Sequence, residues 1–599
     1  MHPEFLRKTM KKTLATGNES FLDMIRDNRY YVDKTSFIKP LIESGIYVQL
    51  ITRPRRFGKT LFMDTLHRFL EINPQNPGDT TKQAQLFSGL NVTKEAEFCA
   101  QFMGQYPVLF ISLKDVKGLD FASARTELAH TLLQKALSFS YLLDSPKLSD
   151  FDKSFLKNCS TMGYLKNPEN FDEAKKFLTY MVQILAKHYE RQVILLIDEY
   201  DVPLQKSVKA GYYKQMLEFM QSFLSLLKSS SELKVNDRQA LRKTILTGCL
   251  RVSKASIFTD VNNFDVDSVC TQGGPLSAAI GFTESEVNQL LAYYDLEEKK
   301  DTVKQWYDGY RIGNSEIFCP WDVVRFCDGI QRPEVDQEKF VPENYWADTS
   351  SNEVIEEFLR FISSTDADRM QTLVDGGSID IRINDQLTYG EFKKHRSEDF
   401  WTLLLYTGYL TITARPERGV YRLHIPNAEI RETFSTRIQN YFSDENEAYA
   451  ARGESVAKAL FRGDQEGVKE QLSELLESYV SVRDTATRAN AENYYHGFLL
   501  GLLSSTEMVK NMESNREAGD GFADLIFTSS GARVGVVLEL KHCNEIKDMT
   551  GVAKKALDQI KSKRYTQGLK GYACTKSYGY GIAFCRKACV VTVGDFSQI

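Results

Sequence analysis

Three residues that could bind a phosphate, Gly58-Lys59-Thr60, stand between an apolar run that begins at Val48 and a segment with helical spacing at residues 61–70. The apolar run predicts a buried strand, and the spacing predicts a helix. A strand, a loop and a helix in this order form a phosphate-binding loop, in which backbone N–H groups at the helix N-terminus hold phosphate oxygens. We expect Lys59 to reach the β- and γ-phosphates of ATP and the Thr60 hydroxyl to bind Mg²⁺.

The loop before this lysine departs from the pattern G-x-x-x-x-G-K-[ST], because Arg53 stands where the first glycine is expected. A loop that is merely basic is therefore the alternative to a nucleotide site. The order of strand, loop and helix favours the nucleotide site. The nucleotide-binding residues expected in this loop are Arg53, Pro54, Arg55, Arg56, Phe57, Gly58, Lys59 and Thr60.

A second run of branched aliphatic residues ends in two acids, Asp198 and Glu199. Such a run suits a strand that is buried on both faces of a parallel sheet, and these sheets bind ligands at the carboxyl ends of their strands. We expect Asp198 to hold Mg²⁺, as a Walker B aspartate does, and Glu199 to polarise the attacking water. Taken alone, the pattern is more often structural. Its combination with the phosphate loop favours the catalytic interpretation.

Two further segments could complete the nucleotide pocket. A third strand is predicted from Lys243 to Gly248, which places Thr247 at the strand end as a polar sensor. Arg251 follows within reach of a γ-phosphate, with a solvated loop residue as the alternative. Residues 31–34 precede the first strand, and we expect them either to pack on the nucleotide base or to form an aromatic contact with the next helix.

Two carboxylates and a lysine that could cleave a phosphodiester lie near the C-terminus, at Asp524, Glu539 and Lys541. A glycine-rich turn enters the predicted strand that carries Asp524, and a second predicted strand carries the other two residues. Alternation along that strand puts Glu539 and Lys541 on one face, and a hairpin would bring Asp524 beside them. We expect Asp524 and Glu539 to bind Mg²⁺ and Lys541 to position the attacking water.

The composition is that of an ordinary soluble globular protein: 599 residues, 42% hydrophobic and 26% charged, which predicts three or four domains. No apolar run approaches the roughly 20 residues that span a bilayer, and the N-terminus lacks the apolar core of a secretory signal. We therefore expect a cytoplasmic location. The ten cysteines form no Cys-x-x-Cys pair, which argues against a zinc ribbon. A net charge of −5 gives no global nucleic-acid signature.

Four motifs together resemble the AAA-ATPase-like family of bacterial proteins, which is related to archaeal-type ATPases with a Pro-Arg-Arg-x-Gly-Lys-Thr loop. These motifs are residues 31–35, 53–60 and 196–201, and Thr247-Gly248 with Arg251. Members of the family typically carry a C-terminal PD-(D/E)XK nuclease-like domain.

The C-terminal residues resemble the signature of that nuclease-like domain. Asp524 stands for its first acid and Glu539-Leu540-Lys541 for its second motif. Glu492 matches an acid that many members place on the first helix, which implies a catalytic role for it. Local charge and the resemblance together imply that Lys561, Lys563 and Arg564 line a nucleic-acid backbone.

The resemblance implies an α/β fold: a P-loop NTPase parallel sheet with a helical, winged-helix-like lid, followed by an α/β PD-(D/E)XK nuclease-like domain. The parts that we expect are an N-terminal extension (1–25), the ATPase-like domain (26–280), the lid (281–440), a helical connector (441–484) and the nuclease-like domain (485–599). Within the lid, residues 403–411 and 421–426 predict a small hairpin.

The leading hypothesis is an ATP-binding and ATP-hydrolysing protein whose nucleotide state regulates a Mg²⁺-dependent nuclease that acts on DNA. Its cofactors would be ATP and Mg²⁺, its partner nucleic acid, with no membrane, and an oligomer is compatible with the sequence. A non-catalytic nucleotide-dependent switch or scaffold, whose C-terminal domain binds nucleic acid or a protein, is the alternative. A purely structural protein with both sites decayed is disfavoured, because a decayed site has no physical reason to keep buried acids.

Overall fold

A computed structural model of the whole chain describes residues 11–599 with gaps. The gaps are 229–232, 251–263, 333, 347–363, 375, 385–386, 388, 390–395, 435–446, 480–490, 505, 532, 544, 573, 586–587 and 598–599. The chain divides into two compact units, Met1–Val354 with Asp380–Ile430, and Ile355–Ile379 with Arg431–Ile599. None of the helices in the described ranges has both the length and the apolar character needed to cross a bilayer.

The first unit is built on a parallel sheet of five strands in the order β2-β3-β6-β1-β7. These strands are β1 (Val48–Thr52), β2 (Val108–Ser112), β3 (Val193–Asp198), β6 (Leu241–Gly248) and β7 (Phe264–Asp267). Every residue of β1 and β3 is buried, as expected for strands that are covered on both faces. The structure confirms the α/β class and the parallel sheet that the sequence predicts.

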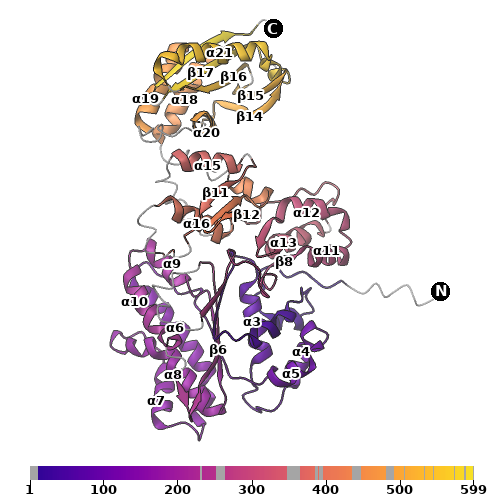
Figure 1. Cartoon of the computed structure of the whole chain (residues 1–599), viewed down its shortest axis with the longest axis vertical. Helices are drawn as coiled ribbons and strands as arrows, with labels where there is room; N and C mark the ends of the chain where they lie inside the picture. The colour runs from indigo at the N-terminus through magenta and orange to yellow at the C-terminus, as the bar shows by residue number, and fades with distance from the viewer. Residues whose placement is uncertain are drawn as a thin grey trace, which may run out of the picture. The chain divides into compact units, whose positions relative to one another are not determined.

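Helices cover both faces of this sheet (Figure 1). One side carries α3 (Lys59–Leu70), α4 (Thr81–Leu86) and α5 (Ala96–Phe102), with α1 (Phe21–Arg26) and α2 (Ile38–Glu43) also in this unit. The other side carries α6 (Phe121–Ser138), α7 (Asp150–Cys159), α8 (Phe171–Tyr189), α9 (Val202–Lys209) and α10 (Tyr213–Phe223). The chain between β2 and β3 thus forms the three helices α6, α7 and α8, joined by short turns.

Two small three-stranded sheets follow the parallel sheet in the chain. The first has the order β8-β10-β9 and packs with α11 (Glu284–Tyr293), α12 (Lys300–Tyr307) and α13 (Pro320–Ile330). Its strands are β8 (Phe282–Thr283), β9 (Tyr310–Ile312) and β10 (Ser315–Phe318). The second has the order β11-β13-β12, from β11 (Ile379–Arg382), β12 (Thr411–Glu417) and β13 (Val420–His424). The winged-helix character of this region stays a prediction.

The hairpin that we predicted in this region begins later than expected. The leucines at 403–405 lie in α16 (Ser397–Thr407), and the first hairpin strand starts only at Thr411. A short apolar run fits a buried helix as well as a buried strand, and every residue from Phe400 to Tyr406 in α16 is buried. Gly408 ends the helix with a φ of 93°, which glycine adopts easily.

The second unit has a mixed five-stranded sheet in the order β14-β15-β16-β17-β18. Its strands are β14 (Val509–Ala518), β15 (Gly521–Ser529), β16 (Val534–His542), β17 (Lys576–Cys585) and β18 (Ala588–Asp595). The pair β16–β17 is parallel and the other pairs are antiparallel. The predicted glycine-rich turn before the strand of Asp524 is the tight turn at Gly519-Asp520. Residues 515–518 belong to β14 and not to this turn.

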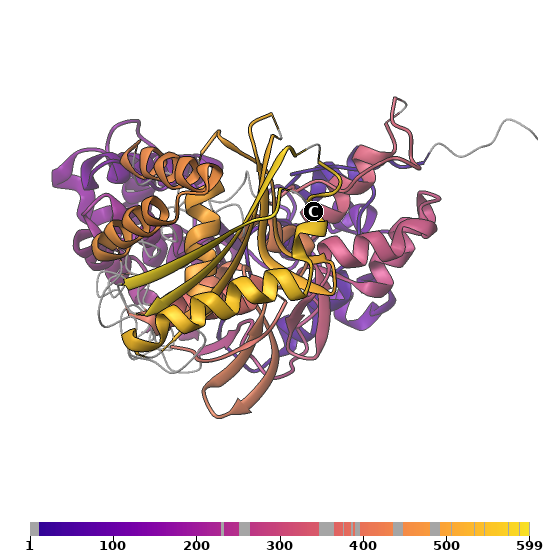
Figure 2. The ribbon, with the colours of Figure 1, turned by 90° about the horizontal axis from the view of Figure 1, so that it is seen from above.

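Helices also cover both faces of this second sheet. One face packs with α18 (Glu447–Arg462), α19 (Gln465–Tyr479) and α20 (Ala491–Ser504) in a large apolar core. The other face packs with α21 (Met549–Ser562), the crossover between β16 and β17. Figure 2 shows α21 lying along the strands of this sheet. The unit also contains α15 (Ser364–Val374).

Candidate functional site

The phosphate loop lies between β1 and α3, as the sequence predicts. Gly58 precedes the helix with a φ of 95°, and no side chain caps the N-terminus of α3. The first-turn N–H groups of a helix have no partner within the helix, and together with the helix dipole they form a natural anion site. The loop therefore has the backbone arrangement that a phosphate group requires.

Lys59 is buried at the start of α3 and makes several polar contacts. Its Nζ donates to the carbonyl oxygens of Arg53 at 3.2 Å and Pro54 at 3.1 Å, and lies 3.4 Å from Glu199 Oε1. Burial lowers the pKa of Lys59, but the neighbouring groups Cys249, Glu199, Asp198 and Asp201 outweigh it and raise the pKa above its usual value. Lys59 therefore stays positively charged at neutral pH.

A hydrogen-bonded chain links the phosphate loop to the ends of two strands. The Thr60 hydroxyl donates to Asp198 Oδ2 at 2.8 Å, and the Thr247 hydroxyl donates to Asp198 Oδ1. Because β6 lies between β1 and β3, Thr247 and Asp198 meet at neighbouring strand ends. Burial, followed by the charge of Glu199, raises the pKa of Asp198. The cluster offers hydroxyl and carboxylate oxygens, the donors that Mg²⁺ prefers.

Glu199 follows Asp198 in a strained conformation. Its φ of 53° lies in the left-handed region, which non-glycine residues rarely adopt. Such strain persists only where the surroundings impose it, and it concentrates at functional sites. The side chain is 18% exposed and lines the cavity described next, as a residue that polarises water must.

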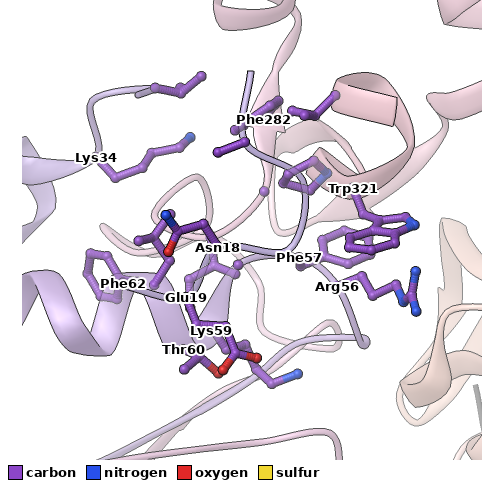
Figure 3. Close-up of a pocket in the computed structure, with 18 of the residues that line it drawn as sticks. Asn18, Glu19, Lys34, Arg56, Phe57, Lys59, Thr60, Phe62, Phe282 and Trp321 are labelled. Carbon is purple, nitrogen blue, oxygen red and sulfur yellow. The ribbon is translucent and has the colours of Figure 1, made fainter. Parts of the chain in front are cut away.

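A cavity of about 470 Å³ adjoins the phosphate loop. Figure 3 shows Lys34 on one side of it, Asn18 near the middle, and Trp321 with Arg56 on the other side. Residues 56–60 of the loop line the cavity, and so do residues 14–19 and 30–32. Its size and its mixture of apolar and polar walls suit a nucleoside. Part of the segment 31–34 thus lines the cavity. Lys34 Nζ also forms an ion pair with Glu286 Oε2 at 2.6 Å.

The other expected residues of the loop lie outside this lining. The Arg53 side chain is fully buried and bonds Asp267 Oδ1 at 2.8 Å and the Leu276 carbonyl at 3.1 Å. Arg55 donates to Gln205 Oε1 at 2.7 Å. The side chains of Arg53 and Arg55 thus attach the loop to neighbouring parts of the first unit. Arg251 lies outside the described residues.

Arg56 and Trp321 form one wall of the cavity. The Arg56 guanidinium carbon lies 3.9 Å from the centre of the indole ring, and a Cβ on Gly17 would lie 3.1 Å from that ring. Trp321 therefore lies against both a cation and the N-terminal segment. Sequence reasoning assigned neither Trp321 nor residues 14–19 to the site, although Pro320-Trp321 was a segment that resembles the family.

Asp201 is a buried residue that sequence reasoning left without a role. It is 1% exposed and accepts hydrogen bonds from Cys249 N at 3.1 Å, Leu250 N at 2.9 Å and the Tyr389 hydroxyl at 2.9 Å. Burial and the charge of Glu199 raise its pKa. Asp201 therefore fixes the exit of β6 next to Lys59. The sequence feature that could have indicated a role for Asp201 is its position shortly after the end of β3 at Asp198.

The C-terminal carboxylates come together on two antiparallel strands. Asp524 on β15 accepts a hydrogen bond from Leu540 N of β16 at 2.7 Å, which ties it to the strand that carries Glu539 and Lys541. Lys541 Nζ lies 2.9 Å from Glu539 Oε1. Glu539 is 2% exposed, whereas the Lys541 side chain is 29% exposed. The structure thus brings the three predicted residues to one place.

Other residues near this place have structural contacts. His496 Nε2 lies 2.9 Å from the Asp524 carbonyl and 3.2 Å from the Ser514 hydroxyl, so α20 supports β15. Glu492 lies in the first turn of α20, and its side chain falls outside the described part of the structure. Within that described part no group of three or more His, Cys, Asp or Glu residues forms a metal cluster. Asp524 and Glu539 thus offer two carboxylates, a donor set that fits Mg²⁺ with water as its remaining ligand.

Fold and sites together define a P-loop ATPase-like domain joined in one chain to a nuclease-like domain. Comparison with protein families agrees: residues 15–258 match the family described as a predicted AAA-ATPase, and residues 490–593 match the PD-(D/E)XK nuclease superfamily. The chain therefore carries an AAA-ATPase-like domain and a PD-(D/E)XK nuclease superfamily domain.

The chain is also similar to a protein of Azotobacter chroococcum mcd 1 that is described as an uncharacterized protein in the vnfD 5′ region. The two are 27% identical over 439 residues, which is 72% of this chain and 70% of that protein. The match is longer than the AAA-ATPase-like segment alone, so the similarity extends beyond that domain.

Proposed function

We propose that this protein binds and hydrolyses ATP, and that its nucleotide state regulates a Mg²⁺-dependent nuclease domain that acts on DNA. The observation that carries the proposal is the pairing of two sites in one chain. One is the hydrogen-bonded chain Thr60–Asp198–Thr247 beside Lys59 and Glu199. The other is the Asp524–Glu539–Lys541 group. Both arrangements suit chemistry at phosphorus.

At the nucleotide site each residue has a separate task. Lys59 supplies a positive charge at the helix N-terminus, where the β- and γ-phosphates would lie. Thr60 and Asp198 would hold Mg²⁺, which neutralises phosphate charge when it is bound. Glu199 accepts a hydrogen bond from the attacking water and orients it. Thr247 holds Asp198 in place from the neighbouring strand.

At the nuclease site the carboxylates have different surroundings. The Leu540 N–H fixes Asp524, and Lys541 lies against Glu539. Asp524 and Glu539 would hold Mg²⁺, which stabilises the charge that develops on the phosphodiester when it is bound. The partly exposed Lys541 ammonium orients the attacking water and balances the charge of the buried Glu539.

Separate measurements of ATP binding and ATP turnover test the first site. Lys59→Ala removes the phosphate-facing charge and should abolish binding. Glu199→Gln keeps the shape of the side chain but not its basicity, so binding should persist while turnover falls roughly 100-fold or more. Lys175→Ala, which removes an exposed ion pair with Asp172 on α8, is a control that should behave like the wild type. Wild-type turnover in Glu199→Gln would exclude the assigned role.

Cleavage of plasmid or single-stranded DNA with Mg²⁺ tests the second site. Glu539→Ala and Lys541→Ala should each lose cleavage, whereas Glu545→Ala should not, because Glu545 is exposed and pairs with Lys547 beyond the strand. Cleavage that is unaffected in Glu539→Ala and Lys541→Ala would remove the nuclease from the proposal. ATP binding that is lost in Lys59→Ala, without turnover or cleavage in the wild type, would identify the switch or scaffold instead.

A further inference from the structure

Glu539 lies on the face of the C-terminal sheet that α21 covers. In the parallel pair β16–β17, Glu539 is aligned with Gly581, and aligned residues of neighbouring strands share a face. A Cβ on Gly581 would lie only 2.2 Å from the Ala553 carbonyl oxygen of α21 and 2.4 Å from Leu557 N. The helix backbone therefore rests directly on the strand position beside Glu539.

Lys541 lies on the same face, two residues further along. It is aligned with Ala583, which belongs to a buried cluster with Met549 and Ala553 of α21. Asp524 shares this face by alternation, since Ile526 packs with Leu557 and Ile560. The three predicted nuclease residues thus lie beside α21, with Glu539 and Lys541 next to its first two turns.

The solvent face of α21 is basic. Its buried side consists of Met549, Ala553, Ala556, Leu557 and Ile560. Its exposed side carries the lysines 554, 555 and 561, with Asp558 as the one acid of the helix. None of these three lysines forms an ion pair with a described residue. Arg564, just beyond the helix, differs, because it pairs with Asp520 through bonds of 2.8–3.1 Å.

On the opposite face of the sheet, α19 is mostly acidic. There α19 packs through Val468, Leu472 and Leu475 against the core that contains Leu538 and Leu540. Its exposed side carries Glu466, Glu470 and Glu474, and its lysine, Lys469, pairs with Glu466 at 3.5 Å. A polyanion would be repelled from α19 and attracted to α21.

We propose that the solvent face of α21 binds the phosphodiester backbone of double-stranded DNA and brings it to the Asp524–Glu539–Lys541 group. The inference rests on the proposed nuclease function and names the surface that the substrate uses. Lysines without protein partners can neutralise phosphates and release the counterions condensed on DNA, which drives binding. Lys554 and Lys555 directly follow Ala553, whose carbonyl oxygen faces Gly581 beside Glu539, so the helical turn that carries them is the turn that rests on this strand position.

The test is the affinity of the full chain for a short fluorescent DNA duplex, measured in EDTA at several salt concentrations so that cleavage does not interfere. Lys554→Ala with Lys555→Ala should weaken binding at least tenfold and reduce the slope of log K against log salt by about 1–2, since each lost phosphate contact reduces it by roughly 0.9. Lys561→Ala should cause a smaller loss. Lys469→Ala on α19 is the matched control and should change neither quantity.

Further readouts separate this inference from the proposed catalysis. Glu539→Ala should bind the duplex without cleaving it. Unchanged affinity and salt slope in the double variant, with wild-type cleavage intact, would overturn the surface and leave the nuclease standing. Loss of binding in the double variant, from a wild type that never cleaves, would support the surface while the catalytic proposal fails. A wild type that binds no duplex, or prefers an RNA duplex, would overturn the inference.

Discussion

At the residue scale, Asp322 and Glu429 form an unusual buried pair in the first unit. Asp322 is fully buried, and Glu429 Oε1 accepts hydrogen bonds from Tyr345 N at 2.6 Å and Trp346 N at 2.9 Å. Burial raises the pKa of both carboxyl groups, and the charge of Asp322 raises that of Glu429 further. At least one carboxyl of the pair therefore holds a proton at neutral pH.

Glu429→Gln should flatten the dependence of stability on pH. The folded pKa of Glu429 is raised, so the folded state keeps a proton that the unfolded chain releases near 4.5. Wild-type stability should therefore fall as the pH rises from that value toward the raised folded pKa. Glutamine cannot titrate but can still accept from Tyr345 N and Trp346 N. We expect the variant to gain on the order of 1–3 kcal/mol relative to the wild type near neutral pH and above.

Thermal denaturation over a pH series measures this effect. The exposed Glu417 provides the control, because Glu417→Gln should leave the pH dependence of the wild type unchanged. Parallel stability curves for Glu429→Gln and the wild type, from acid to alkaline pH, would contradict the prediction.

At the scale of elements, the segment 380–430 contacts the nucleotide edge of the parallel sheet at two points. The Tyr389 hydroxyl donates to Asp201, and a Cβ on Gly408 would lie 2.9 Å from Pro54 Cβ in the phosphate loop. These contacts join the strand ends to a segment that comes about two hundred residues later. The segment therefore forms part of the packing around the phosphate loop.

Tyr389→Phe should destabilise the first unit by about 1–3 kcal/mol, because it removes a hydrogen bond from the buried Asp201 carboxylate. Tyr310→Phe is the matched control: its hydroxyl is also buried but has no hydrogen-bond partner among the described residues, so its removal should be neutral or stabilising. Thermal melting of both variants, with ATP binding as a second readout, makes the comparison. Equal effects of the two substitutions would show that the Tyr389 bond contributes nothing.

The packing of α21 on the C-terminal sheet offers a second paired test. Gly581→Ala would place a methyl group 2.2 Å from the Ala553 carbonyl oxygen, so the helix must move, at a cost of about 1–3 kcal/mol or more. Gly551 lies in α21 itself, and a Cβ added there would have nothing within 4 Å. Gly551→Ala should therefore stabilise the protein by up to about 1 kcal/mol. The stability measured by denaturation and the rate of DNA cleavage should both decline in Gly581→Ala and in neither respect in Gly551→Ala. An unchanged Gly581→Ala protein would exclude the tight packing beside Glu539.

The elements that the sequence predicted well are those whose pattern is local. The strand that ends at Asp198 is a continuous buried run, the strand that ends at Gly248 is buried except for Arg242, and the Glu539–Lys541 alternation needs only a strand. Features that depend on distant partners could not be predicted. The position of Arg53 predicted a nucleotide contact, but its side chain bonds Asp267 of β7, a strand that follows 214 residues later in the sequence. The leucines of α16 likewise form a helix because their whole surroundings are buried.

At the scale of the whole molecule, the proposed nucleotide site and the proposed nuclease site lie in different compact units of one chain. Nucleotide can regulate cleavage only if it binds more tightly to one state of the nuclease unit than to another. A coupling of 1–3 kcal/mol, typical of such linkage, would change an affinity roughly 5- to 150-fold. Regulation by ATP is therefore a measurable difference and does not follow from the presence of two domains.

The regulation predicts that cleavage of DNA by the wild type responds to ATP and that variants of the first unit change this response without touching the nuclease residues. Lys59→Ala, which we expect not to bind ATP, should cleave at one rate whether ATP is present or not. Glu199→Gln, which we expect to bind ATP without turnover, should hold the ATP-bound rate for as long as ATP lasts, whereas the wild type returns to the other rate as ATP is consumed. Glu539→Ala should keep the ATPase activity and lose cleavage, which would show that each site works in an intact chain.

Time courses of cleavage and phosphate release from the same samples measure the two activities of each variant. Wild-type cleavage that is identical with and without ATP, from a chain that hydrolyses ATP normally, would show that the two activities are independent.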